Sequence, residues 1–270
     1  MKFSVLISVY FKENPLFLDR ALRSIYHEQT KKPDEIVLVE DGKLGNELDK
    51  IVEKFKNEVG DILKIVPLQT NMGLSRALEI GVGFCSHELI ARMDSDDISM
   101  PTRFEEQLKF LEANPEIDAV GTFISEFETD ENELYSYRTL PIDSSELAVF
   151  ARKRCPLNHV SVMMKKEMLL KAGNYESFKG IEDYFLWGKM LINGARFANL
   201  PLFLVKVRAG RAMILRRGGF DYAMMEFRLQ KKFLEIGFIN FFEFLRNVAI
   251  RFPVRVMPKF LRELAYKAFR

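Results

Sequence analysis

Over residues 1–115, short runs of apolar and β-branched residues alternate with longer segments whose apolar residues recur at helical spacing. The short runs predict buried strands, which we place at 2–10, 33–42, 61–68 and 88–94. The longer segments predict amphipathic helices, which we place at 15–29, 46–59, 73–85 and 101–114. Such alternation across short connections is typical of an α/β layer fold with a mostly parallel sheet flanked by helices.

The pattern changes after about residue 116, where the alternation becomes irregular. There the chain predicts strands at 118–128, 133–141 and 196–208, helices at 144–153 and 180–194, and a strand that turns into a helix over 158–173. We interpret this region as a mixed part that completes the same domain. From about residue 221 we expect two or three amphipathic helices, broken at Pro253 and Pro258.

Composition is that of a globular protein, with 48% hydrophobic and 29% charged residues among 270. The formal net charge of +2 does not suggest a nucleic-acid partner. Basic charge gathers near the end, because residues 226–270 hold ten Lys and Arg, four Asp and Glu, and nine of the 24 Phe. This basic, Phe-rich tail is either a set of helices packed on the domain or an interfacial membrane anchor, and both can hold together.

Two cysteines without a CxxC spacing argue against a disulfide scaffold or a cysteine zinc site and favour a reducing compartment. The apolar start, MKFSVLISVY, lacks a long hydrophobic region and a small-residue cleavage site, so we expect a strand there and not a signal peptide. No stretch of about 18 uncharged apolar residues occurs, so we expect no transmembrane helix.

Candidate chemistry gathers where the predicted strands end. In parallel sheets, ligands bind outside the carboxyl ends of the strands, and the chain offers polar residues there at 8–10, at 40–41 and at 94–97. The stretch LIARMDSDDISMPTRFE crowds Asp94, Asp96 and Asp97 together, although neighbouring carboxylates repel and raise each other's pKa. Something cationic is expected to compensate them.

Two interpretations of these acids remain open. They can be an acidic helix start, favoured by capping and by the helix dipole, with Asp97 paired to Arg103. They can also be a divalent cation site, because Mg²⁺ and Mn²⁺ prefer carboxylate oxygens and keep positions for phosphate and water. Asp94 and Asp96 are separated by one residue, so in an extended segment they point the same way.

Five motifs occur in order over about residues 3–190: VLISVYFKENP, EIVLVEDG, NMGLSRALEIGV, ELIARMDSDD and GIEDYFLWGKM. Together they resemble the inverting family-2-type nucleotide-sugar glycosyltransferases with the GT-A fold. PTRFEEQ after the acids and RRGG near residue 217 are similar to the bacterial enzymes that build O-antigen and exopolysaccharide repeat units. The resemblance implies a catalytic domain over 1–220, with a nucleotide-binding half at 1–115 and an acceptor half at 116–220, followed by the helical tail at 221–270.

The resemblance also implies roles for single residues in holding the donor. Ser8 and Tyr10 would lie along the nucleobase and ribose, and Asp41 would accept from the base imide, which favours uracil. Three residues would shape the floor of the nucleotide pocket: Asn71, Gly73 and Arg76. Asp94 would lie on the ribose side, and Asp96 would bind the Mn²⁺ or Mg²⁺ that bridges the diphosphate.

For the acceptor side the resemblance implies that Asp183 is the general base and Glu182 its neighbour, although the pair can also be acids that open a helix. His159 can lie near the acceptor or diphosphate, or can be structural. Arg217 belongs to an Arg- and Gly-rich segment, which can close over phosphates, contact membrane phosphates or remain a solvated loop.

The expected activity is transfer of a single hexose, glucose or galactose, from a UDP-sugar to an undecaprenyl-diphosphate-linked saccharide. The product would be a β1,3 linkage to GlcNAc in O-antigen or related biosynthesis, at the inner face of the bacterial cytoplasmic membrane. The lack of a QxxRW motif argues for single transfer. Alternatives are another donor in lipopolysaccharide-core or exopolysaccharide synthesis, or a nucleotidyltransferase, whose Gly-rich phosphate loop is replaced here by YFKENP.

Overall fold

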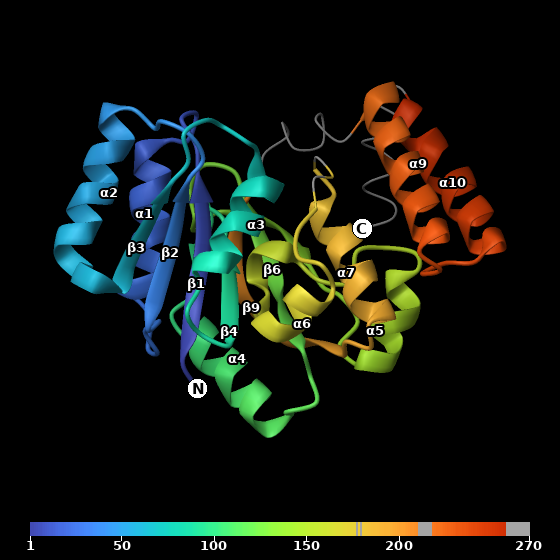
Figure 1. Cartoon of the computed structure of the whole chain (residues 1–270), viewed down its shortest axis with the longest axis horizontal. Helices are drawn as coiled ribbons and strands as arrows, with labels where there is room; N and C mark the ends of the chain where they lie inside the picture. The colour runs from blue at the N-terminus through green and yellow to red at the C-terminus, as the bar shows by residue number, and fades with distance from the viewer. Residues whose placement is uncertain (177, 179, 210–217, 258–270) are drawn as a thin grey trace.

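In the computed structural model, residues 1–176, 178, 180–209 and 218–257 are described. Within them the strands form one sheet of order β3-β2-β1-β4-β8-β6-β9-β5, with β7 paired to β6 (Figure 1). The strands are β1 (Phe3–Val9), β2 (Glu35–Glu40), β3 (Leu63–Pro67), β4 (Leu89–Met93), β5 (Ile98–Ser99), β6 (Ala119–Phe127), β7 (Leu134–Arg138), β8 (Met163–Lys165) and β9 (Phe197–Arg208). The helices are α1 (Pro15–Tyr26), α2 (Asn46–Val59), α3 (Leu74–Phe84), α4 (Arg103–Ala113), α5 (Ser144–Ala151), α6 (Lys166–Lys171), α7 (Glu182–Ile192), α9 (Phe220–Glu235) and α10 (Phe241–Val256), with short 3₁₀ turns at Gly60–Ile62 and His159–Ser161.

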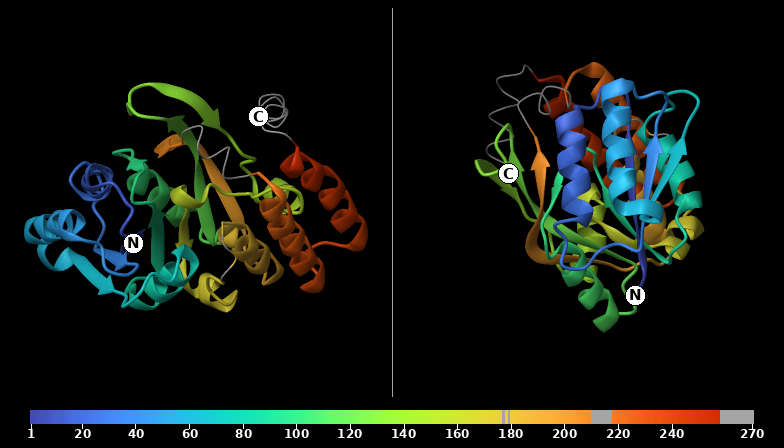
Figure 2. Two further views of the ribbon diagram at one scale, coloured as in Figure 1. Left: turned by 90° about the horizontal axis from the view of Figure 1, so that it is seen from above. Right: turned by 90° about the vertical axis from the view of Figure 1, so that its left-hand side faces the viewer.

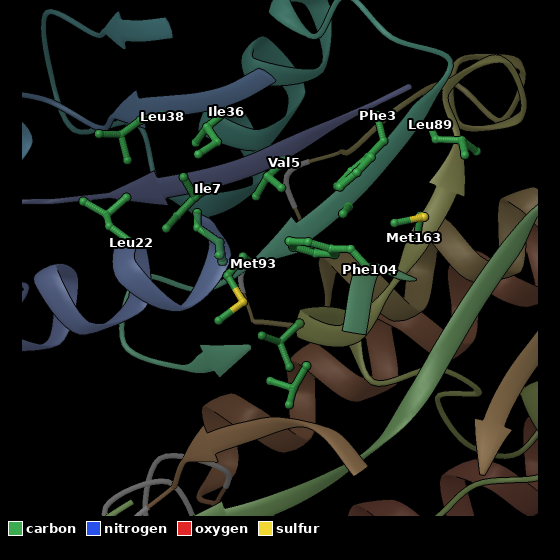
Figure 3. Packing of buried hydrophobic residues seen from close by; sticks show 14 of the residues in the cluster. Phe3, Val5, Ile7, Leu22, Ile36, Leu38, Leu89, Met93, Phe104 and Met163 are labelled. Carbon is green, nitrogen blue, oxygen red and sulfur yellow. The ribbon is translucent and has the colours of Figure 1, made fainter. Parts of the chain in front are cut away.

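The first four strands along the chain are parallel to one another and carry helices on both faces. Side chains alternate between the faces, so Ile7 joins an apolar layer with α1, α2 and α4, whereas Leu6 joins a second layer with α3. Figure 3 shows the first layer, where the rings of Phe3 and Phe104 lie with centroids 5.0 Å apart. The predicted α/β layer fold is therefore confirmed.

The second half of the sheet is mixed. β8 runs antiparallel to both β4 and β6, while β9 runs parallel to β6. β5, which the sequence pattern did not predict, pairs with β9 through Ile98↔Lys206 and Ser99↔Val205. This short pairing places the acidic turn after β4 next to the end of β9.

The helices α9 and α10 lie side by side at the end of the molecule opposite α2 (Figures 1 and 2). Phe233 of α9 packs against Tyr184 and Phe185 of α7, with ring centroids 4.9 Å and 6.0 Å away. The tail helices thus pack on the domain. Among the described helices, none is long and apolar enough to cross a membrane.

The expected break at Pro253 is wrong, because α10 continues through it to Val256. Pro253 lies on the exposed side of the helix, near its end. Its ring removes one backbone hydrogen bond, and the carbonyl left without that bond belongs to Ala249, which is also exposed and can be hydrated. Pro258, the second expected break, lies outside the described residues.

Candidate active site

The acidic turn after β4 is neutralised in part by the chain itself. Arg92 points from β4 into the interior, is only 1% exposed, and places its Nη2 2.5 Å from Oδ1 of Asp94. Arg92 was not predicted as a site residue, although a charge inside the otherwise apolar run LIARM is the usual signal of a buried ion pair. The cation that compensates Asp94 is thus a guanidinium supplied by β4 itself, two residues before Asp94.

Asp96 is less well compensated. Burial raises its pKa to about 7, and the nearby carboxylates of Asp94 and Glu13 add to the effect. Glu13 follows β1 and accepts a 2.5 Å hydrogen bond from the Ser95 hydroxyl, so it too belongs to this cluster. The sequence placed Glu13 in the loop after the first strand, at the same sheet edge as the other acids, which is the signal that could have identified it.

Asp97 has a structural partner different from the expected one. Its Oδ1 accepts a 2.7 Å hydrogen bond from the backbone N–H of Arg208 at the end of β9, while burial and its acidic neighbours hold its pKa well above the usual value. The expected pairing with Arg103 is wrong. Arg103 is fully buried and donates instead to the carbonyl of Arg92, at 2.7 Å, and to Gln107, at 3.2 Å.

Arg208 joins the acidic turn to two aromatic rings. Its guanidinium lies 3.6 Å from the ring centroid of Phe17 and 4.5 Å from that of Phe127, and its Nε lies 3.3 Å from the carbonyl oxygen of Asp96. These contacts fix the turn on the end of β9. Arg211, Arg216 and Arg217, the other arginines of this segment, lie outside the described residues.

The expected nucleotide-side residues lie at the ends of β1 and β2 and at the start of α3. Ser8 is half-buried and Tyr10 is exposed. Asp41 is 3% exposed, and its two carboxylate oxygens accept the backbone N–H groups of Met72, at 2.6 Å, and Gly73, at 2.9 Å. Asp41 therefore shapes the loop that enters α3.

Two further residues of this group lie beside that loop. Asn71 donates its side-chain amide to the carbonyl of Asp41 at 3.2 Å. Arg76 forms an ion pair with Glu79 at 2.6 Å, one turn along α3. Asp41, Asn71 and Gly73 are thus brought together, while Arg76 is turned to a partner on its own helix.

The second acidic pair opens α7. Glu182 is buried, and its Oε2 accepts the N–H of Gly180 at 2.7 Å. Burial and neighbouring Asp183 raise the pKa of Glu182, whereas Arg92 acts to lower it. Asp183 is half-buried, and the thiol of Cys155 lies 3.6 Å from its Oδ2. Asp183 is therefore the more accessible of the two acids.

A polar cluster lies between the two acidic groups. His159 forms a 2.8 Å hydrogen bond with the hydroxyl of Tyr175, and the buried ring of Trp187 lies 6.0 Å from the imidazole. Burial lowers the pKa of His159 well below its usual value, and Arg92 contributes to this. Burial raises the pKa of Tyr175, Arg92 lowers it, and Asp183, Glu182 and Asp94 raise it further. The structure thus places Tyr175 within electrostatic reach of both acidic groups.

The donor set fits a hard divalent cation. Asp96 and Asp94 offer carboxylate oxygens, and the raised pKa of Asp96 marks a carboxylate that lacks sufficient positive charge nearby. Within the described residues, no group of three or more His, Cys, Asp or Glu side chains is arranged to hold an ion. Mg²⁺ sites of transferases commonly use one or two carboxylates together with substrate phosphates, and Asp94 and Asp96 suit that arrangement.

Comparison with solved structures shows the same fold. Staphylococcus aureus TarS, in a structure with UDP-GlcNAc, matches with a TM-score of 0.68 and 19% identity over 94% of this chain and 72% of that one. The mannosyltransferase PcManGT from Pyrobaculum calidifontis, in complex with GDP-Man and Mn²⁺, matches with a TM-score of 0.66 and 18% identity over 87% of this chain and 64% of that one. At this identity the likeness shows the GT-A fold alone.

Comparison of sequences identifies the family. An uncharacterised glycosyltransferase of Haemophilus influenzae is 40% identical over 100% of this chain and 99% of its own. The amylovoran biosynthesis glycosyltransferase AmsE of Erwinia amylovora is 40% identical over 97% of this chain and 98% of its own. A UDP-Gal:α-D-GlcNAc-diphosphoundecaprenol β-1,3-galactosyltransferase of Escherichia coli is 36% identical over 98% of this chain and 95% of its own. Since the family model described as glycosyl transferase family 2 also matches residues 4–175, the chain belongs to glycosyl transferase family 2.

Proposed function

We propose that this glycosyltransferase moves one hexose, galactose or glucose, from a UDP-sugar to a saccharide carried on undecaprenyl diphosphate, with inversion and formation of a β1,3 linkage to GlcNAc. The full-length similarity to the Escherichia coli galactosyltransferase supports galactose and a lipid-linked acceptor. Similarity to AmsE supports a role in the synthesis of a bacterial surface polysaccharide. The site of action is then the inner face of the cytoplasmic membrane, where nucleotide sugars are available.

The observation that carries this proposal is that one buried cation serves both acidic groups. Arg92 contacts Asp94 on the donor side and lowers the pKa of Glu182 on the helix that carries Asp183. Transfer of a sugar needs a held leaving diphosphate and a nearby base for the acceptor hydroxyl. The acids after β4 and at the start of α7 both lie within electrostatic reach of this one guanidinium, which supports a shared site for the two requirements.

In this proposal Asp183 accepts the proton of the acceptor hydroxyl as its oxygen attacks the anomeric carbon from the side opposite the diphosphate. The bond to the diphosphate breaks as the new glycosidic bond forms, so an α-linked donor gives a β-linked product. No second carboxylate nucleophile is needed, in contrast to retaining hydrolysis. Glu182 fixes the start of α7 through Gly180 and thereby orients Asp183.

Donor binding is assigned to the other acidic group. Asp96 and Asp94 would hold the Mn²⁺ or Mg²⁺, which would supply positive charge to the leaving diphosphate. Ser8, Tyr10 and the loop held by Asp41 contact the uridine. His159 stays neutral beside Tyr175 and supports the wall between donor and acceptor.

The test separates the two roles. UDP-galactose and UDP-glucose are offered with a GlcNAc-diphosphoryl lipid analogue, and the product linkage is read by NMR. Asp183→Asn is expected to lower kcat by on the order of 10²- to 10⁴-fold while Mn²⁺-dependent UDP binding is retained. Asp96→Ala is expected to weaken that binding as well. Asp61→Asn, at an exposed acid, is the control and should behave as the parent. Full activity of Asp183→Asn would refute the assigned base.

A further inference from the structure

Cys155 contacts the carboxylate that the proposed function assigns as the base. It lies between α5 and the 3₁₀ turn at His159–Ser161. Its Sγ is 3.6 Å from Oδ2 of Asp183 and 3.4 Å from the carbonyl oxygen of Leu157. A thiol carries one proton, so it donates to one of these two acceptors at a time. The carboxylate is the acceptor that carries charge, and hydrogen bonds to ionised groups are the stronger ones.

The thiol of Cys155 is held in its protonated form. Burial raises its pKa well above the ordinary value, the charge of Asp183 raises it further, and Arg138 of β7 acts to lower it. A thiol in this state is a hydrogen-bond donor and not a nucleophile. Within the part of the chain that the structure describes, it is the only group that donates a hydrogen bond to the Asp183 carboxylate. Oδ1 of Asp183 is thereby left for an acceptor hydroxyl.

The segment that carries Cys155 is fixed by three neighbouring elements. Its backbone carbonyl groups accept hydrogen bonds from α7, α10 and β9, at 2.6, 2.8 and 3.1 Å. The donor on α7 is the residue that follows Asp183, so the thiol and the carboxylate are tied to each other through the backbone as well. The three donors are Tyr184, Asn247 and Asn199, which bond the carbonyls of Ala151, Arg152 and Pro156 respectively.

We propose that Cys155 is a positioning residue for the transfer reaction, whose S–H group holds one oxygen of Asp183 and so turns the other toward the acceptor hydroxyl. The proposal rests on the assignment of Asp183 as the base. A weak donor suits this role, because a strong hydrogen bond to a carboxylate stabilises its ionised form and lowers its basicity. The S–H group donates weakly, so it orients the base and leaves its basicity nearly intact.

Two substitutions of nearly equal volume test this role. Cys155→Ala removes the donor, so kcat is expected to fall on the order of 10-fold with an unchanged KM for the UDP-sugar, because the base is no longer oriented. Cys155→Ser keeps a donor and should recover most of that loss. Since O–H donates more strongly than S–H, the acidic limb of the kcat–pH profile should lie at lower pH in Cys155→Ser than in the parent. The other ionisable groups that face Asp183 or the thiol, Glu182, Tyr175 and Arg138, are the same in all these proteins.

Infrared spectroscopy tests the contact without reference to activity. A Cys85→Ser background leaves Cys155 as the single thiol of the chain. The S–H stretching band should move to higher frequency when Asp183→Asn is added, because the hydrogen bond to a charged acceptor is lost. The other cysteine is also the matched control. Cys85 donates to the carbonyl of Gly81 at 3.4 Å at the end of α3, and Cys85→Ala should keep the kcat of the parent.

Equal kcat in Cys155→Ala and Cys155→Ser would overturn the proposal, since the two variants differ by the hydroxyl donor. So would an S–H band that Asp183→Asn leaves unchanged, because the proton would then be directed to the Leu157 carbonyl. A strongly impaired Asp183→Asn together with either result would leave the proposed base in place. A fully active Asp183→Asn would instead remove the base and, with it, the role of Cys155, so the two proposals fail in different ways.

Discussion

A single buried side chain, Arg92, explains how three crowded aspartates are tolerated. It contacts Asp94 and offsets part of the charge of Asp97 and Glu182. Its Nε and Nη1 have no hydrogen-bond partner among the described residues. Arg92 therefore acts through its charge more than through a complete set of hydrogen bonds.

This leads to a prediction for stability. Arg92→Met should lower the free energy of unfolding by about 3 kcal/mol, the lower end for a broken buried pair, because Asp94 is about a third exposed. Adding Asp94→Asn should recover part of this loss, since the uncompensated carboxylate is then gone. Urea unfolding of the two single variants and the double variant measures the coupling, which we expect to exceed about 1 kcal/mol.

The exposed pair of Lys54 and Asp19, 2.9 Å apart, provides the matched comparison. The same comparison of single and double variants, with Lys54→Met and Asp19→Asn, should give a coupling energy of about 0.5 kcal/mol. Equal coupling energies at the two pairs would contradict the role given to Arg92.

Residue types at the site could be predicted from the sequence, but their partners could not. The acids at 94, 96 and 97 were identifiable because they follow a buried run. The sequence did not show that Asp97 accepts from the backbone of Arg208, which is distant in the chain, or that Asp41 binds backbone groups at the start of α3. Such contacts depend on which strands become neighbours.

At the scale of elements, α7 is held between the active site and the tail. Gly188 allows α7 to pack closely on α9, because a Cβ at that position would lie 2.5 Å from Cε1 of Phe233, a fully buried ring of α9. A methyl group in place of its hydrogen should therefore separate the two helices. The same helix begins with Glu182 and Asp183, so packing at the tail bears on the site.

We predict that Gly188→Ala destabilises the protein by about 1–3 kcal/mol through overpacking, although the same change usually stabilises a helix. Gly83→Ala in α3 is the control, since its Cβ would meet nothing within 4 Å. The free energy of unfolding of that variant should rise by about 0.5–1 kcal/mol. Thermal unfolding compares the two, and a gain in stability at both positions would disprove tight packing of α7 on α9.

Elements with a full hydrophobic pattern were predictable, and shorter ones were not. α2 matches the expected range 46–59, because its apolar residues recur over several turns. β5 has two residues and exists only through its pairing with β9, so no local pattern indicates it. Proline is a local signal of a helix break, but the exposed side of α10 tolerates Pro253.

At the scale of the whole molecule, the buried imidazole of His159 links folding to pH. Its pKa in the folded state lies well below the usual 6.5, so below that pH the unfolded chain binds a proton that the folded chain does not. Stability should therefore be complete above about pH 6.5 and fall as the solution is acidified from there toward the folded pKa.

We predict that His159→Gln flattens the dependence of unfolding free energy on pH between about 5 and 6.5, by up to about 1.4 kcal/mol per pH unit. The variant is expected to be less stable at pH 7.5, because the hydrogen bond to Tyr175 changes, and the readout is therefore the slope. Urea unfolding across this range measures it. A slope as steep as in the parent would exclude a buried neutral imidazole.

The overall topology was predictable only for the half of the sheet that contains β1 to β4, in which strands close in the chain are neighbours in the sheet. Repeated strand–helix units dictate parallel pairing in β1 to β4. β8 lies between β4 and β6, and His159 just before it contacts Tyr175 and feels the charge of Arg92 on β4. No local periodicity encodes that long-range pairing of β8.

The burial of Trp187 has a spectroscopic consequence. It is the single tryptophan of the chain, it is fully buried on α7, and its ring lies 6.0 Å from His159 and 5.8 Å from Phe197. Its emission should be blue-shifted in the folded protein, and protonation of the adjacent imidazole should quench it. Intrinsic fluorescence therefore reports, without any label, on the helix that carries the proposed base.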